Sequence, residues 1–167
     1  MTKSDPKDDE LTHLNPAGEA HMVDVGAKDV TSRRATAEAR VSMRPATLTR
    51  LTRGETPKGD VLAAARIAGI QAAKRTSELI PLCHAIALTR VEIAIELVEA
   101  DRQAVVRATA EARDRTGVEM EAMVAASVAA LTLYDMLKAI DRGITYTVAL
   151  VEKSGGKTGE WRRDGGP

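Results

Sequence analysis

Asp135 and Lys138 are the acidic and basic side chains of this sequence that are best placed to act as a pair. They lie three residues apart in a segment predicted to be helical, and residues at that spacing share one helix face. Such a pair is either a modest surface ion pair or an acid and a base with mutually shifted pKa values. Acid–base work near pH 7 would require that one member has a pKa moved toward neutrality.

Lysines that could bind an anionic substrate are spread along the chain. Lys58 lies in the turn 57–60 before a predicted helix, where backbone N–H groups and the helix dipole favour anions. Lys74 lies near the end of the same helix, and Lys153 and Lys157 flank a Gly-Gly turn. The alternative for each is a solvated surface lysine, because phosphate binding requires that several of them converge.

A second group of candidates surrounds Cys83 and His84. Adjacent Cys and His side chains rarely activate each other, so a buried cysteine and a capping histidine are the alternative to a histidine that carries protons or binds phosphate. Thr116 and Glu119 have the spacing of a capping box, which gives Glu119 a structural explanation. Glu121 has none, and it opens an apolar segment in which an unpaired carboxylate would be costly.

Composition argues against nucleic-acid binding and against a protein-bound metal. Lys plus Arg and Asp plus Glu are 24 each, so the net charge is zero, and aromatic residues make up only 2%. A nucleic-acid binder is normally basic and offers aromatic side chains for base stacking. The three histidines lack metal-ligand spacing, and a single cysteine forms neither a zinc site nor an intrachain disulfide. We therefore expect no nucleic-acid partner and no metal cofactor held by the protein.

The elements that must position these residues follow from the periodicity of the sequence. Alternation of apolar and polar residues predicts strands at 35–43, 88–98, 104–113 and 144–151. Proline, capping and glycine signals predict helices at 45–53, 60–79 and 117–142. This order predicts an α+β, ferredoxin-like split βαβ fold, with a four-stranded antiparallel sheet and helices packed on one face.

The two ends of the chain differ in composition from its middle. We expect a flexible N-terminal arm at 1–30, a ferredoxin-like catalytic domain at 31–154 and a flexible Gly-rich tail at 155–167. The N-terminus lacks the apolar stretch of a signal peptide, and no apolar run is judged to approach the roughly 20 residues of a membrane helix. These features predict a cytoplasmic protein that does not bind membranes.

Several longer segments resemble the cyclic pyranopterin monophosphate synthase family of molybdenum-cofactor synthesis. They follow the order of the family and extend over nearly the whole chain, from about Leu11 to Gly159. The resembling segments are 11–13, 18–25, 58–61, 65–74, 79–84, 116–122, 134–136 and 153–157.

This resemblance implies a ferredoxin-like subunit in a homohexamer, a trimer of dimers, with active sites between subunits. It implies 3′,8-cyclo-7,8-dihydro-GTP as the substrate, whose rings are rearranged to a pterin while a cyclic phosphate closes and pyrophosphate leaves. Mg²⁺ carried by the triphosphate stays an open alternative. So does a different class, an oligomeric nucleotide- or pterin-binding sensor without turnover, because the fold does not fix the function.

Residue by residue, the resemblance makes Asp135 the catalytic aspartate, and we assign Lys138 and Lys58 to the same catalytic group. Substrate binding is assigned to Leu82, Cys83, His84, Glu119, Met120, Glu121, Lys74, Arg33, Asp24 and Lys153. The sequence departs from the family at Ala85, where the family often has Pro, and at Leu137, where it often has Cys. The second departure argues against a thiol role at that position.

Overall fold

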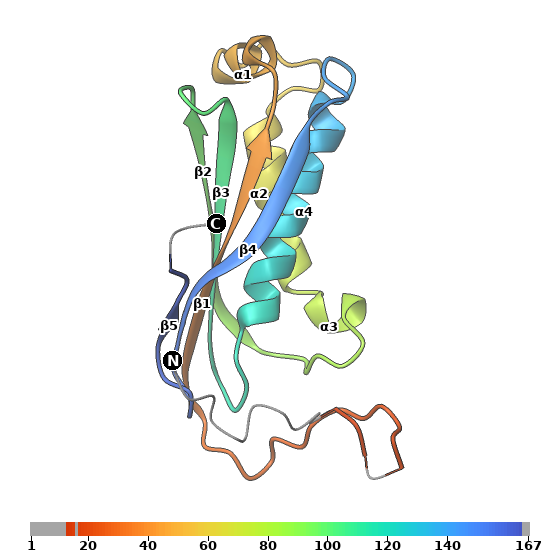
Figure 1. Cartoon of the computed structure of the whole chain (residues 1–167), viewed down its shortest axis with the longest axis vertical. Coiled ribbons are helices and arrows are strands. Elements are labelled where there is room, and N and C mark those ends of the chain that lie inside the picture. Colours follow the sequence, from red (N-terminus) through yellow and green to blue (C-terminus); the bar gives the residue numbers. More distant parts are fainter. Residues whose placement is uncertain (1–12, 16, 165–167) are drawn as a thin grey trace.

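The structure, a computed structural model that describes residues 13–15 and 17–164, contains one antiparallel sheet and two long helices. The strands are β1 (Thr31–Ser42), β2 (Leu88–Val98), β3 (Gln103–Asp114), β4 (Thr145–Ser154) and the short β5 (Trp161–Arg162). The helices are α1 (Pro45–Thr52), α2 (Val61–Ala73), α3 (Thr76–Leu79) and α4 (Glu119–Leu137). The two long helices, α2 and α4, cover the same face of the sheet (Figure 1).

This arrangement confirms the predicted α+β fold with an antiparallel sheet and helices on one face. All neighbouring strands are antiparallel, and the order β2-β3-β1-β4 is that of a split βαβ unit. The sequence predicted four strands, and β5 adds a fifth at the free edge of β4.

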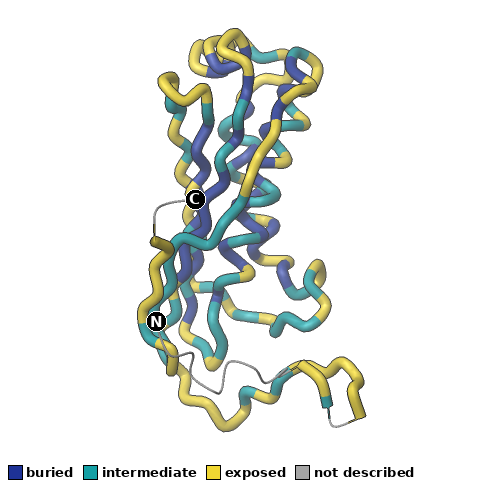
Figure 2. Tube along the Cα trace, in the orientation of Figure 1, coloured by how far each residue is buried: buried dark blue, intermediate teal, exposed yellow. Residues whose placement is uncertain are grey.

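Small side chains allow the helices to lie close to the sheet and to each other. Ala35, Ala37 and Ala39 on the inner side of β1 are fully buried, as the dark trace along the middle of the sheet in Figure 2 shows. A Cβ at Gly69 of α2 would lie 2.9 Å from the carbonyl oxygen of Ala125 in α4, so no larger residue fits there without a shift. The close packing fixes α2 beside α4.

The helix predicted at 60–79 is confirmed at its start and interrupted near its end. Asp60 is the N-cap of α2, and its carboxylate accepts a 2.9 Å hydrogen bond from the N–H of Ala63. The helix ends at Ala73, Lys74 is its C-cap, and α3 begins two residues later. Lys58 and Lys74 are therefore held just outside opposite ends of α2.

Apolar side chains remain uncovered on the outer face of the two long helices. Leu131 of α4 is 50% exposed and Ile67 of α2 is 57% exposed. By length and composition α4 could cross a membrane, so the expectation that no apolar run approaches that length is wrong. Half of its apolar stretch is buried inside the fold, as in a core helix. The apolar side chains on the outward side of α2 and α4 are therefore left uncovered in a single chain.

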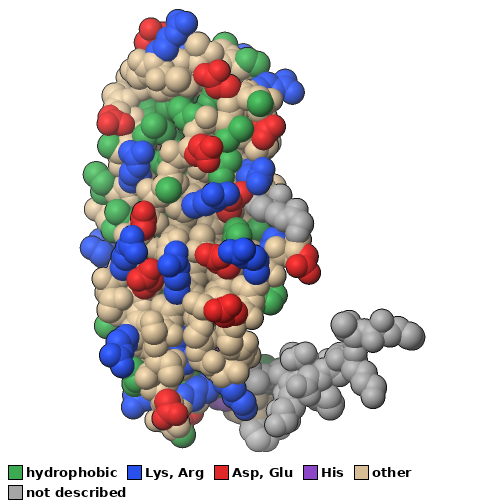
Figure 3. All heavy atoms as spheres, turned by 90° about the vertical axis from the view of Figure 1, so that its left-hand side faces the viewer, with side chains coloured by type: hydrophobic (Ala, Val, Ile, Leu, Met, Phe, Trp, Pro, Cys, Tyr) green, Lys and Arg blue, Asp and Glu red, His purple; other side chains and the backbone are tan. Residues whose placement is uncertain are grey.

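The opposite face of the sheet carries charges that are paired within the chain (Figure 3). Glu38 of β1 is only 1% exposed and lies 2.7 Å from Arg107 and 3.0 Å from Arg40. Basic and acidic side chains are interspersed on this side of the molecule, so many of its charged groups are paired with each other.

Candidate functional site

Asp135, Lys58 and Lys138 meet where α2 begins and α4 ends. Lys58 Nζ donates to Asp135 Oδ2 at 2.9 Å and to the Asp135 carbonyl oxygen at 3.1 Å. Lys138 Nζ lies 2.6 Å from Asp135 Oδ1. The sequence predicted contact between Asp135 and Lys138 from their spacing. The approach of Lys58, which is 77 residues from Asp135, comes from the packing of α2 on α4.

Hydrogen bonds keep Asp135 and Lys138 ionised. The bonds from Lys138 and then from Lys58 lower the pKa of Asp135 to about 2, and the bond to Asp135 raises the pKa of Lys138. Both pKa values move away from neutrality, so the expectation that one of them moves toward it is wrong for the single chain. At neutral pH, Asp135 is a carboxylate that holds two ammonium groups side by side.

Asp141 ties the segment after α4 to the start of α1, close to this cluster in the fold. Its buried carboxylate accepts 2.9 Å hydrogen bonds from the N–H of Arg44 and from Thr47 Oγ1. Burial raises the pKa of Asp141, but these hydrogen bonds and one from Gly143 outweigh it, and the pKa is lowered. The connection fixes the end of α4 against the segment that leads to Lys58.

At the other end of α4 lies a hollow of about 480 Å³ that contains several of the residues assigned to substrate binding. Among the residues that line it are Leu82, Cys83, His84, Met120 and Glu121. His84 lies with Nε2 2.9 Å from the carbonyl oxygen of Val23, so the imidazole also anchors the arm that precedes β1.

Glu121 is the acidic side chain in this hollow whose pKa approaches neutrality. It is 3% exposed, and burial, followed by repulsion from Glu119 and Asp114, raises its pKa to about 6, against the effect of its own backbone N–H. Burial and the charge of Glu121 also raise the pKa of the Cys83 thiol. A thiol that holds its proton is a poor nucleophile, so the structure argues against a covalent role for Cys83.

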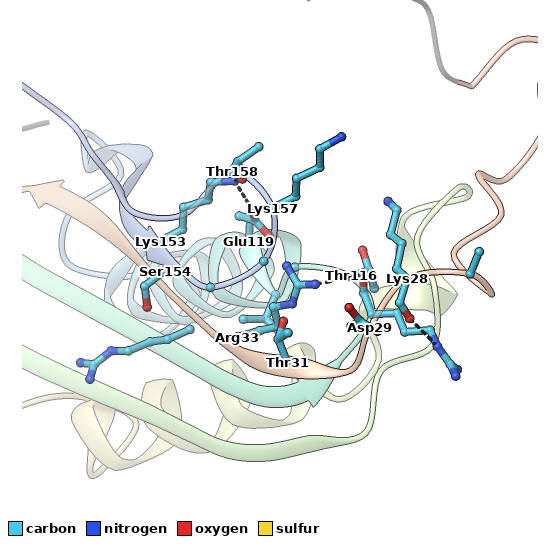
Figure 4. Close-up of a pocket in the computed structure, with 17 residues that line it drawn as sticks. Lys28, Asp29, Thr31, Arg33, Thr116, Glu119, Lys153, Ser154, Lys157 and Thr158 are labelled. Carbon is cyan, nitrogen blue, oxygen red and sulfur yellow. Dashed lines mark hydrogen bonds and ion pairs between the residues drawn. The ribbon is translucent and has the colours of Figure 1, made fainter. Parts of the chain in front are cut away.

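A second and more basic hollow, of about 640 Å³, adjoins the first (Figure 4). Both are lined by Lys28, Thr116, Gly117 and Glu119, so the two spaces are continuous neighbours. The segment after β4 forms one wall and the start of α4 another.

Glu119 does not form the predicted capping box with Thr116. The N-cap of α4 is Val118, which makes no side-chain capping bond. The Glu119 carboxylate instead lies 3.2 Å from Lys153 Nζ, which also donates to Thr158 Oγ1 at 2.8 Å. The predicted structural role of Glu119 is therefore replaced by an ion pair inside the basic hollow.

Two of the other predicted binding residues serve the fold of their own surroundings. Arg33 donates from Nε to the carbonyl oxygen of Asp114 at 3.2 Å and from Nη2 to that of Arg115 at 3.1 Å. Asp24 accepts a 2.7 Å hydrogen bond from the N–H of Gly26 in a local turn. Arg33 lines the basic hollow, whereas Asp24 lines neither hollow.

The length of α4 separates the predicted residues into two groups. Glu121 and Asp135 are 14 residues apart on this helix, which at about 1.5 Å per residue is roughly 21 Å. Asp135, Lys58 and Lys138 lie at one end, and the residues of the two hollows lie at the other. One chain therefore carries two partial sites that do not meet.

Three cationic residues of the basic hollow, Lys28, Arg34 and Arg115, were not predicted from the sequence, and Lys157 was named there only as a candidate lysine without an assigned role. The Gly-Gly turn next to Lys157 was visible in the sequence, but the approach of Lys28 and Arg115 to it depends on the folded arm. Within the described residues, no group of three or more His, Cys, Asp or Glu side chains is placed to hold a metal ion.

Comparison with known proteins gives a consistent result over most of the chain. The model of the MoaC family matches residues 22–156. A Thermomicrobium roseum protein named cyclic pyranopterin monophosphate synthase is 56% identical over 156 residues, which cover 93% of this chain and 94% of that protein. A Brucella ovis protein of the same name is 55% identical over 152 residues, 90% of this chain and 92% of that protein.

A solved structure of the ferredoxin protease FusC in complex with Arabidopsis ferredoxin is also similar, at 12% identity and a TM-score of 0.30. The match covers 68% of this chain and 11% of that chain.

Proposed function

The chain belongs to the MoaC family, and from this premise we propose that its two partial sites, joined between copies, convert 3′,8-cyclo-7,8-dihydro-GTP to cyclic pyranopterin monophosphate and pyrophosphate. The activity is that of a cyclic pyranopterin monophosphate synthase, a lyase of molybdenum-cofactor biosynthesis. The observation that carries the proposed substrate is the pair of adjoining hollows. One holds a buried acid beside Cys83 and His84, and the other is basic. The proposed substrate is divided in the same way, because its ring system is joined to a phosphate chain.

The charges of the site match the charge that develops in this reaction. Pyrophosphate leaves with negative charge on the departing oxygen, and cationic groups fixed beforehand stabilise that charge without reorganisation. Lys153 at the basic hollow and the Lys58–Lys138 pair beside Asp135 are the groups that we assign to this task. Asp135 keeps the two ammonium groups in place in the absence of substrate.

Proton transfer during ring opening and closure is assigned here to Glu121, because both pKa values of the Asp135–Lys138 pair lie away from neutrality. A general base works best when its pKa lies near the working pH, and Glu121 meets that condition with a pKa of about 6. It is also placed in the hollow that we assign to the rings. The carboxylate form would accept a proton from the substrate.

Replacing Glu121 by Gln is expected to change the pH dependence of turnover. In the wild type, kcat/KM should rise with pH through a midpoint near 6, because the ionised Glu121 is the active form. In Glu121→Gln this limb should disappear, and kcat should fall by about 10²-fold or more. Rates of pyrophosphate release measured between pH 5 and 8 test this expectation.

Thermal unfolding over the same pH range provides a control for Glu121. Its pKa is raised from its ordinary value of 4.5 to about 6, so the folded chain binds the proton more tightly than the unfolded chain. Its contribution to stability is therefore full below pH 4.5 and falls as pH rises to about 6. Glu121→Gln should remove that slope. A variant that keeps the wild-type kinetic limb would show that another group carries the proton.

Self-association joins the two partial sites in this proposal. The uncovered apolar side chains Ile67 and Leu131 lie on the α2–α4 layer, and a second copy is the partner that we assign to this surface. A twofold contact between antiparallel α4 helices would bring Asp135 of one copy toward Glu121 of the other. Three such dimers make the proposed homohexamer. The single Cys83 is unpaired, which fits a cytoplasmic location.

Incubation of the purified protein with 3′,8-cyclo-7,8-dihydro-GTP tests the proposed substrate and reaction. We expect equal amounts of pyrophosphate and cyclic pyranopterin monophosphate, with rates proportional to enzyme concentration. A ferredoxin-like sensor would bind the nucleotide at the same hollows and release no pyrophosphate during the incubation. That outcome would replace the proposed turnover by ligand binding.

A further inference from the structure

The Gly155–Gly156 turn is fitted tightly against the start of the central strand β1, at Ser32 and Arg33. Both glycines have positive φ, +93° and +76°, which side-chain-bearing residues rarely adopt. A Cβ at Gly155 would overlap the carbonyl oxygen of Ser32, and one at Gly156 would overlap the guanidinium of Arg33. The turn can therefore lie where it does only because it carries no side chains.

The Arg33 side chain packs against this turn and supports it. Its Nε and Nη2 are hydrogen-bonded to the carbonyl oxygens of Asp114 and Arg115, and its remaining Nη1 faces Gly156. The guanidinium thus joins three segments: β1, the end of β3 and the segment after β4. Two of the five N–H donors of the guanidinium are used by these carbonyl oxygens, and Nη1 lies against Gly156, so the geometry favours a role in holding the turn.

Lys153 is also engaged, whereas two other lysines of the same hollow are not. Lys153 is paired with Glu119 and bonded to Thr158. In the part of the chain that the structure describes, Lys28 and Lys157 have no ion-pair partner, and both are exposed. Figure 4 shows their side chains extending from opposite walls of the hollow, with Arg33 and Thr116 between them.

The charge of the hollow is strongly unbalanced. Its acidic lining residues are Asp29 and Glu119, and Glu119 is already neutralised by Lys153. The cationic lining residues are Lys28, Arg33, Arg34, Arg115, Lys153 and Lys157. A space of this charge favours a compact polyanion, and phosphate oxygens accept the strongest hydrogen bonds from ammonium groups.

From this geometry we infer that Lys28 and Lys157, which have no ion-pair partner in the described chain, bind the phosphate chain in the basic hollow together with Lys153, and that Arg33 is a positioning residue. Arg33 acts through the Gly155–Gly156 turn, which carries Lys157 into place. The ligand class is a di- or triphosphate, including the pyrophosphate that leaves. The inference rests on the proposed function only for the reaction, because polyphosphate binding can be measured without turnover.

The experiment measures the binding of inorganic pyrophosphate by titration calorimetry to the full-length protein. Lys157→Ala and Lys28→Ala should each weaken binding roughly tenfold, the size of one lost charge-assisted hydrogen bond. Lys157→Arg should retain most of the affinity because it keeps the cation. Arg53→Ala is the matched control. It removes an exposed positive charge at the end of α1, near the opposite end of β1 from the hollow, and should leave the affinity unchanged.

The positioning role of Arg33 is tested by double-mutant cycles in which a change at Arg33 or at Gly156 is combined with Lys157→Ala. Arg33→Ala and Gly156→Ala should each displace the turn and reduce pyrophosphate affinity to the level of Lys157→Ala. If both act through Lys157, either change should add little to Lys157→Ala when the two are combined. Additive losses would mean that Arg33 contacts the phosphate itself. Thermal midpoints and assembly size of every variant identify general unfolding.

The outcomes separate this inference from the proposed function. Wild-type protein that turns over the substrate, together with unchanged pyrophosphate affinity in Lys157→Ala and Lys28→Ala, would overturn the inference and leave the function intact. Pyrophosphate binding that depends on Lys157 in a protein that releases no pyrophosphate from the substrate would support the inference and remove the function. Wild-type protein that does not bind pyrophosphate would also overturn the inference.

Discussion

Asp135→Ala is expected to fold and assemble as the wild type does and to lose turnover by about 10³-fold, within the range of acid–base and electrostatic contributions to catalysis. The Asp135 side chain is 52% exposed, so its removal leaves no buried cavity. What it removes is the carboxylate that holds Lys58 and Lys138 side by side. The two ammonium groups would then repel each other and separate. Steady-state rates of pyrophosphate release give the measurement.

Two comparisons make this prediction specific. Asp101→Ala removes an exposed carboxylate from the turn between β2 and β3 and should keep wild-type turnover. Asp135→Asn keeps the shape of the side chain but loses the charge, so it should be nearly as impaired as Asp135→Ala. A folded, assembled Asp135→Ala protein with a rate within threefold of wild type would remove Asp135 from the catalytic group.

The sequence predicted the fold well because the fold depends on local patterns. Alternation at 35–43 placed β1, and the small residues on its inner side proved to be the positions that pack against α4. Asp60 was recognised as a cap because its partner is only three residues away. The break after Ala73 was not predicted, because neither Gly nor Pro marks it.

The site was harder to predict because its contacts are long in sequence. Glu119 had the spacing of a capping box, but the folded chain offered it the ammonium group of Lys153 from a distant strand. The third member of the Asp135 cluster, Lys58, depends on the antiparallel packing of α2 on α4. Lys28 reaches the basic hollow only through the folded arm. Such convergence leaves no periodic trace in a single sequence.

One signal in the sequence could have revealed the division of the site. Glu121 and Asp135 were both predicted on one uninterrupted helix, and that alone places them about four turns apart. A proton carrier must lie within hydrogen-bond reach of the reacting atom, or one water away. The helix length thus already implied that the two residues of one chain do not serve the same substrate molecule.

Mixing two inactive variants is expected to restore activity if the two ends of α4 from different copies form one site. Glu121→Ala removes the acid of the hollow, and Asp135→Ala removes the carboxylate of the cluster at the opposite end of α4. In a random one-to-one mixture of twofold-symmetric dimers, half are mixed, and each mixed dimer has one site with both wild-type parts. We therefore expect about one quarter of the wild-type pyrophosphate release. Co-expression with two different affinity tags allows mixed assemblies to be isolated.

A mixture of Asp135→Ala with Lys58→Ala is the decisive control, because both changes lie in the same cluster. Every site in that mixture takes its cluster from one of the two damaged copies, so no site is intact and activity should stay at the level of the separate variants. Equal recovery of activity in both mixtures would show that the recovery does not come from a site shared between copies. No recovery in the Glu121→Ala mixture, with mixed assemblies verified, would contradict the shared site, because roughly 21 Å of α4 separates the two groups within one chain.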